Sequence, residues 1–375
     1  MADAVAEQIA ALRDEDWAIR EEAATALGTL RDARAVGPLV RVLGDADRSV
    51  RQAASAALVS LGEASVPSLV ACAGQSDVGI QETAFAILAD IADARAVPVL
   101  LLALKSLNWI VRSHAAKALG RIGAADTVSA LLPLLQDKVK AVRVEAGLAL
   151  ARLGPAAVAD LVEALSHHEW LVRLHAVEAL GKMKSPDAVE PLLYVLFNDS
   201  DTAVREDAVR ALGEIADRRA TEFLLKVVKE PGLRPLAIEA LGLIGDPSAV
   251  AALIPIARGE ARPEDSRAIA GCGDAWNEEM LAMPAAARAL GRIGDEAALP
   301  ALAAALRHTV TRADAAAALV RFGSKAVPHL LPLLQQTTDD NIRYHVKDTL
   351  TQVGWRPGRI PVSKVAPVAV RRAES

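Results

Sequence analysis

Apolar positions recur at helical spacing through most of the chain. Between positions 17 and 30, for example, apolar residues stand at Ile19, Ala23, Ala26 and Leu27. These intervals of three and four residues place the side chains on one face of a helix. The same pattern returns again and again along the sequence, so we expect a chain built almost entirely of amphipathic helices.

Each such segment is followed by a helix stop and by a second apolar segment. Gly123 and Gly245 stand where a first segment ends, a position at which glycine is favoured. Many second segments have a proline in their first turn, where the missing N–H costs little. These prolines are Pro38, Pro67, Pro98, Pro191, Pro300 and Pro328. Each pair of segments therefore predicts a helix hairpin whose apolar face must be covered by the neighbouring hairpins.

The hairpin recurs in one register along nearly the whole chain. An arginine anchors the first helix at Arg20, Arg51, Arg112, Arg143, Arg173, Arg205, Arg234, Arg312 and Arg343. Gln81 and Met283 occupy the same position in two further repeats, and successive anchors lie 29 to 32 residues apart except between Arg234 and Met283. We therefore predict an all-α fold, a right-handed α-solenoid of about eleven two-helix repeats.

The spacing also predicts how the chain is divided. Repeats one to eight span 1–258 and repeats nine to eleven span 284–355, with an insertion loop at 259–283 between them. Insertions in repeat arrays often project from the binding face, so Trp276 in this loop is a candidate contact residue; an ordinary surface loop is the alternative. The segment 356–375 contains prolines and arginines without helical period and is predicted to be an extended tail.

The repeat consensus, V-R-x-x-A-x-x-A-L-G followed by A-V-x-P-L, resembles the short HEAT repeat of bilin lyases and of many bacterial scaffold proteins. This resemblance implies a solenoid. It leaves the function open, because such arrays serve as adaptors, lyase subunits, regulators and occasional enzymes. In the family, an acid six residues before the anchor commonly forms a ladder between neighbouring repeats. Asp14, Asp45, Asp137 and Asp199 match that position, and we interpret them as structural.

Composition narrows the possible partners. The formal net charge is −5, whereas nucleic-acid binders usually carry a basic surface that neutralises phosphates, so nucleic acid is not the expected partner. No uncharged apolar run reaches the roughly 18 residues of a membrane span, and the N-terminus lacks the features of a signal peptide. Neither Cys72 nor Cys272 belongs to a metal-binding motif. We expect a cytoplasmic protein without a metal or a cofactor.

A row of polar residues occupies the second position after the anchor in repeats four to seven. Its members are His114, Glu145, His175 and Asp207. Alternating imidazoles and carboxylates can bind metals or transfer protons. Equivalent residues of packed helices lie about 10 Å apart, however, which is too far for them to share one ion. Polar contacts between neighbouring helices are the alternative interpretation of this row.

The same row invites comparison with deoxyhypusine hydroxylase, a HEAT-repeat di-iron enzyme whose helices carry adjacent His-Glu pairs. In this chain, His114 is followed by Ala115 and His175 by Ala176, so the paired glutamate is missing at both positions. The residue pattern therefore does not predict hydroxylase activity.

The second helices are expected to expose a mixed row of side chains, which includes Leu102, Glu163, Tyr194 and Lys226. Tyr194 and Phe197 lie one helical turn apart, and aromatic side chains often anchor interfaces; covering the edge of the core is their alternative role. No catalytic residues stand out. We therefore predict a non-catalytic protein-binding scaffold or adaptor that holds a protein or peptide on its concave surface. The alternative is a tetrapyrrole (bilin) lyase or chaperone subunit similar to phycobilisome lyases.

Overall fold

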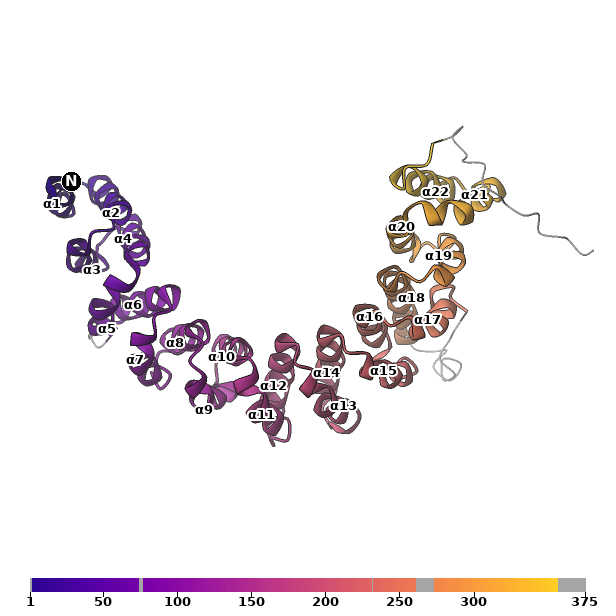
Figure 1. The fold of residues 1–375 in the computed structure, drawn as a ribbon, viewed down its shortest axis with the longest axis horizontal. Helices are drawn as coiled ribbons and strands as arrows, with labels where there is room; N and C mark the ends of the chain where they lie inside the picture. The colour runs from indigo at the N-terminus through magenta and orange to yellow at the C-terminus, as the bar shows by residue number, and fades with distance from the viewer. Residues whose placement is uncertain (1, 74–76, 231, 261–272, 357–375) are drawn as a thin grey trace, which may run out of the picture. The chain divides into compact units, whose positions relative to one another are not determined.

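The computed structural model describes residues 2–73, 77–230, 232–260 and 273–356. The chain forms two compact units, an N-terminal unit of Met1–Asp217 and a C-terminal unit of Arg218–Ser375. All assigned elements in the described ranges are helices, which confirms the predicted all-α solenoid (Figure 1). The first helix of each repeat is the one that carries the anchor position, and the second helix is the one after it.

The N-terminal unit begins with α1 (Ala2–Ala11) and continues as stacked hairpins joined by short turns. Its helices are α2 (Trp17–Leu30), α3 (Val36–Val42), α4 (Arg48–Leu61), α5 (Val66–Ala73), α6 (Val78–Ile91), α7 (Val97–Ala103), α8 (Trp109–Ile122), α9 (Val128–Leu131), α10 (Lys140–Leu153), α11 (Pro155–Ala164), α12 (Trp170–Met183), α13 (Val189–Asn198) and α14 (Thr202–Ile215). The even-numbered members from α2 onward are the first helices of repeats one to seven.

The C-terminal unit continues the same alternation. Its helices are α15 (Thr221–Val227), α16 (Arg234–Ile244), α17 (Val250–Ala257), α18 (Gly273–Ile293), α19 (Leu299–Ala305), α20 (Arg312–Arg321), α21 (Val327–Gln336) and α22 (Asp340–Gln352). All eleven predicted first helices are thus present, from α2 to α22, and the last of them begins one residue after its cap Asp339.

One part of the predicted organisation is wrong. The insertion expected to be a loop over 259–283 is helical from Gly273 onward, because α18 starts there and runs through the anchor position Met283. The sequence after Asn277 is rich in Glu, Met, Leu and Ala, which all favour helix, so local propensity extends the first helix of repeat nine backward. The described residues end at 260 and resume at 273.

The starts of the first helices in the N-terminal unit follow the capping rules, with two exceptions. The side chains of Asp16, Asp47 and Asp201 accept backbone N–H groups at the starts of α2, α4 and α14, which satisfies donors that the helix itself leaves free. In contrast, α10 and α12 begin after Val139 and Glu169, neither of which forms a side-chain cap. These two helices lie next to each other in the stack.

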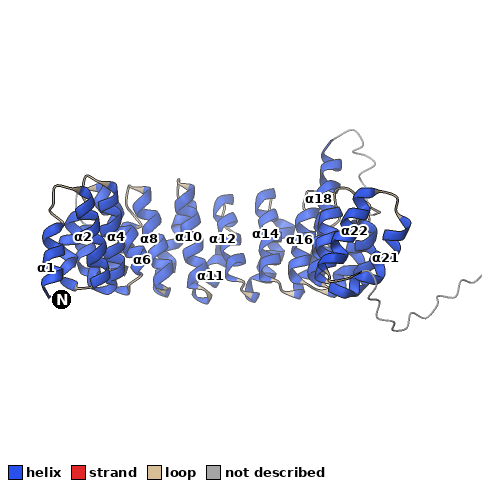
Figure 2. Ribbon diagram, turned by 90° about the horizontal axis from the view of Figure 1, so that it is seen from above, coloured by secondary structure: helices blue, strands red, loops and turns tan. Residues whose placement is uncertain are grey.

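The A-L-G motif controls how closely the first helices approach. A Cβ atom added to Gly120 would lie 2.5 Å from the Cα of Ala149 on the next first helix, and the same contact at Gly28 would be 2.8 Å. Only glycine permits backbones to come this close. The first helices therefore pack directly against one another, and Figure 2 shows those of the N-terminal unit side by side.

Because the first helices pack more closely against one another than the second helices do, the row of first helices is the shorter of the two. Within the N-terminal unit, the first helices follow the inside of the curve and the second helices follow the outside (Figure 1). The mixed row of side chains on the second helices of this unit therefore lies outside the curve, away from the concave surface on which the sequence analysis expects the partner. The residue pattern identifies two amphipathic helices per repeat, but it does not reveal which row is more tightly spaced.

One stretch of the N-terminal unit, Arg48–Ala73, is long and apolar enough by composition to cross a membrane. In the structure this stretch is not a single straight span. It consists of α4, a short turn at Gly62–Ser65 and α5, which together form the second hairpin of the array.

Candidate functional site

The predicted ladder of arginines and acids is present between neighbouring repeats. Arg20 donates from Nε and Nη2 to the two carboxylate oxygens of Asp45 in the next repeat, at 2.8 and 2.9 Å. The main-chain oxygen of Asp45 accepts in turn from Arg51, at 2.6 Å. Asp45 thus joins the arginine of the preceding repeat to that of its own repeat, which supports a structural role for these residues.

The same arrangement recurs further along the array. Arg112 binds both oxygens of Asp137 at 2.7 and 2.8 Å, and Arg173 binds both oxygens of Asp199 at the same two distances. Hydrogen bonds from Arg20 hold the pKa of Asp45 below its ordinary value. Burial alone would raise the pKa of Asp137, but the bonds from Arg112 keep that pKa below its ordinary value as well.

The ladder is interrupted between α10 and α12. The position of the acid is held by His167, whose Nδ1 accepts the backbone N–H of Glu169 at 3.1 Å. This bond replaces the turn contact that Asp137 makes with Val139 in the preceding repeat. An imidazole cannot bind a guanidinium as a carboxylate does, and Arg143 instead donates from Nε to Nε2 of His175, at 3.2 Å.

His175 links the interrupted ladder to the inner surface. This residue is 4% exposed, and its Nδ1 lies 2.6 Å from Oε2 of Glu178, one turn along the same helix. Because Nε2 accepts from Arg143, we assign the proton to Nδ1, which donates it to Glu178. This hydrogen bond holds the pKa of Glu178 below its ordinary value. The contacts form a chain from Arg143 through His175 to Glu178.

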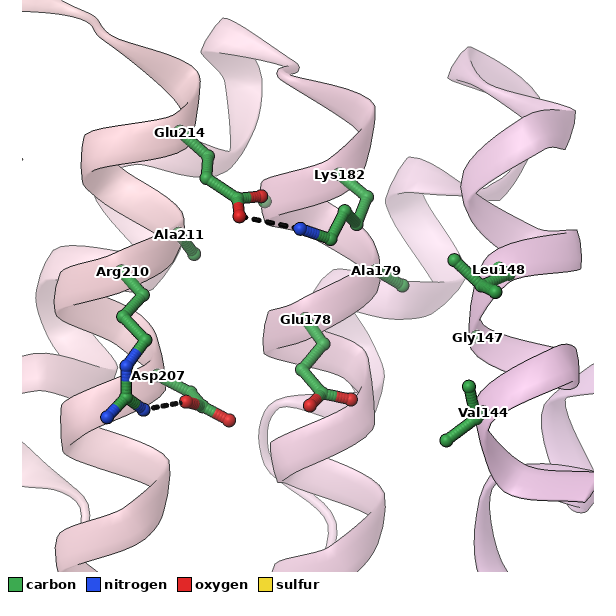
Figure 3. A pocket seen from close by; sticks show the side chains of 11 residues that line it. Val144, Gly147, Leu148, Glu178, Ala179, Lys182, Asp207, Arg210, Ala211 and Glu214 are labelled. Atoms are coloured by element: carbon green, nitrogen blue, oxygen red, sulfur yellow. Dashed lines mark hydrogen bonds and ion pairs between the residues drawn. The ribbon is translucent and has the colours of Figure 1, made fainter. Parts of the chain in front are cut away.

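A pocket of about 240 Å³ lies where this chain ends, between the first helices α10, α12 and α14 (Figure 3). Its lining residues are Val144, Gly147, Leu148, Glu178, Ala179, Gly181, Lys182, Asp207, Arg210, Ala211 and Glu214. Gly147 stands four residues after the anchor, where each of the other ten repeats has a side chain. A Cβ atom at Gly147 would meet only the main-chain oxygen of His175, at 3.8 Å, so this position is open.

Two ion pairs border the pocket. Lys182 of α12 binds Glu214 of α14 at 2.6 Å, and Arg210 pairs with Asp207 on its own helix. The carboxylates of Asp207 and Glu178 lie on facing sides of the gap between α12 and α14 (Figure 3). Burial raises the pKa of Asp207, and the negative charge of Glu178 adds to that effect.

The polar row predicted from sequence lies on first helices, but it does not form a single site. His175 supports the pocket from behind and Asp207 lines it, whereas Glu145 is half-buried on α10 outside the lining. His114 is half-buried on α8, and burial is the main cause that lowers its pKa. Among the described residues, no group of three His, Cys, Asp or Glu side chains could hold a metal ion.

Sequence reasoning missed several lining residues, among them Glu178, Lys182, Arg210 and Glu214. One signal in the sequence points to this place, the glycine at position 147. The histidine at position 167 is less distinctive, because only four of the eleven repeats carry an acid six residues before the anchor.

The residues predicted to bind a partner lie mostly on the outer row. In the N-terminal unit, Leu102, Tyr194 and Phe197 are 73%, 69% and 41% exposed, and Glu163 is also exposed. Lys226 belongs to the C-terminal unit, where its ammonium group lies 5.0 Å from the centre of the Phe223 ring. The side chain of Trp276 falls outside the described residues.

Two shallow hollows flank the turn that precedes α12. One of about 650 Å³ is lined by Tyr194 together with His167 and His168, and the other, of about 660 Å³, by Glu163 with the same two histidines. The two imidazole rings lie 4.3 Å apart. Tyr194 and Glu163 therefore lie on opposite sides of the histidine pair, and Phe197 lines neither hollow.

Stacked helix hairpins with a repeated anchor, a repeated glycine contact and an arginine–acid ladder define an α-solenoid repeat protein. The chain belongs to the HEAT-repeat family. HEAT repeats match residues 5–87, 66–146, 128–195 and 189–271, and the PBS lyase HEAT-like repeat matches 285–308 and 311–336.

Comparison with known proteins finds relatives with different roles. The chain is 34% identical over 98 residues to the bilin biosynthesis protein PecE of Mastigocladus laminosus, a match that covers 24% of this chain and 36% of that protein. It is 31% identical over 226 residues to deoxyhypusine hydroxylase-B of Oryza sativa subsp. japonica, which covers 59% of this chain and 74% of the relative. The chain thus spans about a third of the first protein.

Among solved structures, yeast importin-beta (Kap95p) is similar over 94% of this chain and 57% of that chain, with a TM-score of 0.61 and 15% identity. At this level of identity the likeness concerns the fold alone. It agrees with the helical solenoid described above.

Proposed function

We propose that this protein is a non-catalytic scaffold that holds a protein partner on the row of first helices in its N-terminal unit. The observation that carries the proposal is the pocket of about 240 Å³ on this inner row, in which aliphatic and charged side chains are combined. Such a lining suits a protein surface, because interfaces combine an apolar centre with polar contacts around it. The proposal assumes the cytoplasmic location expected from the sequence.

A comparison of two surface variants tests which row binds. The partner is first captured from native cell extract, identified by mass spectrometry and purified. Its dissociation constant is then measured with wild-type protein, with Val144→Arg/Lys182→Arg on the inner row, and with Tyr194→Ala/Phe197→Ala on the outer row. All four side chains are exposed, so circular dichroism should show unchanged helicity in both variants.

We expect the inner variant to weaken binding at least about tenfold, which is 1.4 kcal/mol, and the outer variant to leave binding nearly unchanged. Equal binding by the inner variant and wild type would contradict the inner surface. Loss of binding in the outer variant alone would assign the partner to the Tyr194–Phe197 surface that the sequence predicts.

A second candidate function is that of a bilin lyase or chaperone subunit. The observation that favours it is the similarity to PecE, together with the two hollows around His167 and His168, which Tyr194 and Glu163 border. Co-expression with enzymes of bilin synthesis tests this candidate. A visible absorption band that co-purifies with the protein, and that weakens in a Tyr194→Ala variant, would favour bilin handling over the protein-binding scaffold.

A further inference from the structure

We propose that the pocket between α10, α12 and α14 receives a long cationic side chain, lysine or arginine, from the partner protein. This inference rests on the proposed scaffold function and names the chemistry by which the inner row would recognise its partner.

The shape of the pocket suits a side chain of this kind. Val144 and Leu148 of α10 and Ala179 of α12 provide an apolar wall, and Gly147 leaves open the space that a side chain would fill. A lysine or arginine has an aliphatic stem that packs on apolar surface while its charged end reaches polar groups. The volume of about 240 Å³ is of the size needed for one such side chain rather than for a helix or a folded loop.

The pocket carries one carboxylate more than its cations neutralise. Lys182 is paired with Glu214, and Arg210 with Asp207. Glu178, the third carboxylate, is hydrogen-bonded to His175, and the proton assignment above makes that imidazole neutral. The pocket therefore presents an unmatched negative charge in a partly buried setting, where a cation from the partner would be favourable.

The facing carboxylates strengthen this preference. The charge of Glu178 is among the causes that raise the pKa of Asp207, so the two groups disfavour one another's ionised form. A guanidinium or ammonium group placed between the carboxylates of Glu178 and Asp207 would be attracted to both and would offset their mutual repulsion. An anionic ligand would instead add a further negative charge beside Glu178, because both lining cations already have carboxylate partners.

The interrupted ladder fixes the orientation of Glu178. Arg143 has no acid to bind in the next repeat, and it holds His175, which in turn holds one oxygen of Glu178. A carboxylate held in this way loses less conformational freedom when a ligand binds. Arg143 and His175 are thus positioning residues, and the absence of an acid at position 167 has a role in building the pocket.

Methyl NMR with small probes tests the inference without knowledge of the partner. The probes are N-acetyl-arginine methylamide, N-acetyl-lysine methylamide, the neutral isostere N-acetyl-citrulline methylamide, and N-acetyl-glutamate methylamide. We expect both cationic probes to shift the methyl signals of Val144, Leu148 and Ala179 in a saturable way. The citrulline probe should bind about tenfold more weakly, because it lacks the charge that strengthens hydrogen bonds to carboxylates.

Substitutions of the lining carboxylates test whether the probes bind in this pocket. Glu178→Gln should lower the affinity for the arginine probe by about tenfold, and Glu178→Gln/Asp207→Asn should lower that affinity further. The matched control is Glu190→Gln with Asp187→Asn, which makes the same chemical changes at exposed positions outside the pocket lining and should leave probe binding as in wild type. Equal binding of citrulline and arginine, stronger binding of the glutamate probe, no binding of any probe, or full binding by the double variant would each overturn the inference.

The two proposals fail in different ways. If the purified partner binds wild type and the Glu178→Gln variant equally, but does not bind Val144→Arg/Lys182→Arg, the scaffold stands and the cationic side chain is wrong. If the cationic probes bind as expected while the partner still binds the inner variant, the pocket has the assigned chemistry and the inner row is not the scaffold's partner surface.

Discussion

Two neighbouring steps of the N-terminal unit differ in how they are held together. Between α8 and α10, Arg112 grips both oxygens of Asp137, and Gly120 allows the backbone of Ala149 to approach closely. Between α10 and α12, Arg143 makes a single contact with His175 at 3.2 Å. The two helices of the second step also pack less extensively than those of the first.

The cause of the difference can be read from one position of the repeat. Where α8 has Gly120, α10 has Ala151, whose Cβ prevents an equally close approach of the next helix. Other closely packed steps, such as α2 with α4 and α12 with α14, also carry the glycine, at Gly28 and Gly181. A regular array buries its inner face in helix–helix contact, whereas a looser step leaves room for a pocket.

The largest expected effect comes from replacing Gly120 on α8 by alanine, the residue that stands at the equivalent position of α10. In Gly120→Ala the new Cβ would lie 2.5 Å from backbone Cα of Ala149, so the helices must move apart. We expect a loss of stability near the upper end of the ~1–3 kcal/mol typical of overpacking. Thermal unfolding followed by circular dichroism measures it. An unchanged melting temperature would show that close helix approach does not determine the stability of this step.

The second effect concerns the ladder. Asp137→Asn removes the charge that Arg112 binds, and we expect a loss of about 1–2 kcal/mol at pH 7. The folded pKa of Asp137 is below its ordinary value, so its contribution is present above the unfolded pKa of about 3.9. That contribution disappears as the pH falls through the lower folded pKa. Urea unfolding of wild type and variant across this range should therefore show a difference that shrinks on acidification; a constant difference would exclude the charge as its origin.

The smallest effect should have the opposite sign. Gly147→Ala places a Cβ 3.8 Å from its nearest neighbour, the main-chain oxygen of His175, which is an ordinary contact. Alanine in place of glycine inside a helix should stabilise the protein by about 0.5–1 kcal/mol. A rise in melting temperature, set beside the fall for Gly120→Ala, would confirm that one step has room and the other does not. A fall in both variants would contradict the comparison.

Much of the fold could be predicted because its causes are local or periodic. The anchor spacing identifies eleven first helices, and the resemblance to short HEAT repeats implies a ladder at acids such as Asp45 and Asp137. The boundaries of the insertion are harder to predict from the sequence. Gly259 and Gly271 indicate a loop, whereas the residues that follow favour the helix that begins at Gly273. Competing local signals there gave the wrong boundary.

The sequence by itself determined that this protein is an array of helix hairpins, with a known register and with irregularities at His167 and Gly147. The tertiary structure decided which row of helices lies inside the curve of the N-terminal unit and that Arg143 reaches His175. It also brought Glu178 and Asp207 to one pocket. The physical reason is that these residues lie on different helices, whose separation depends on whether glycine or alanine stands at each contact. Such distances exist only once the hairpins are stacked.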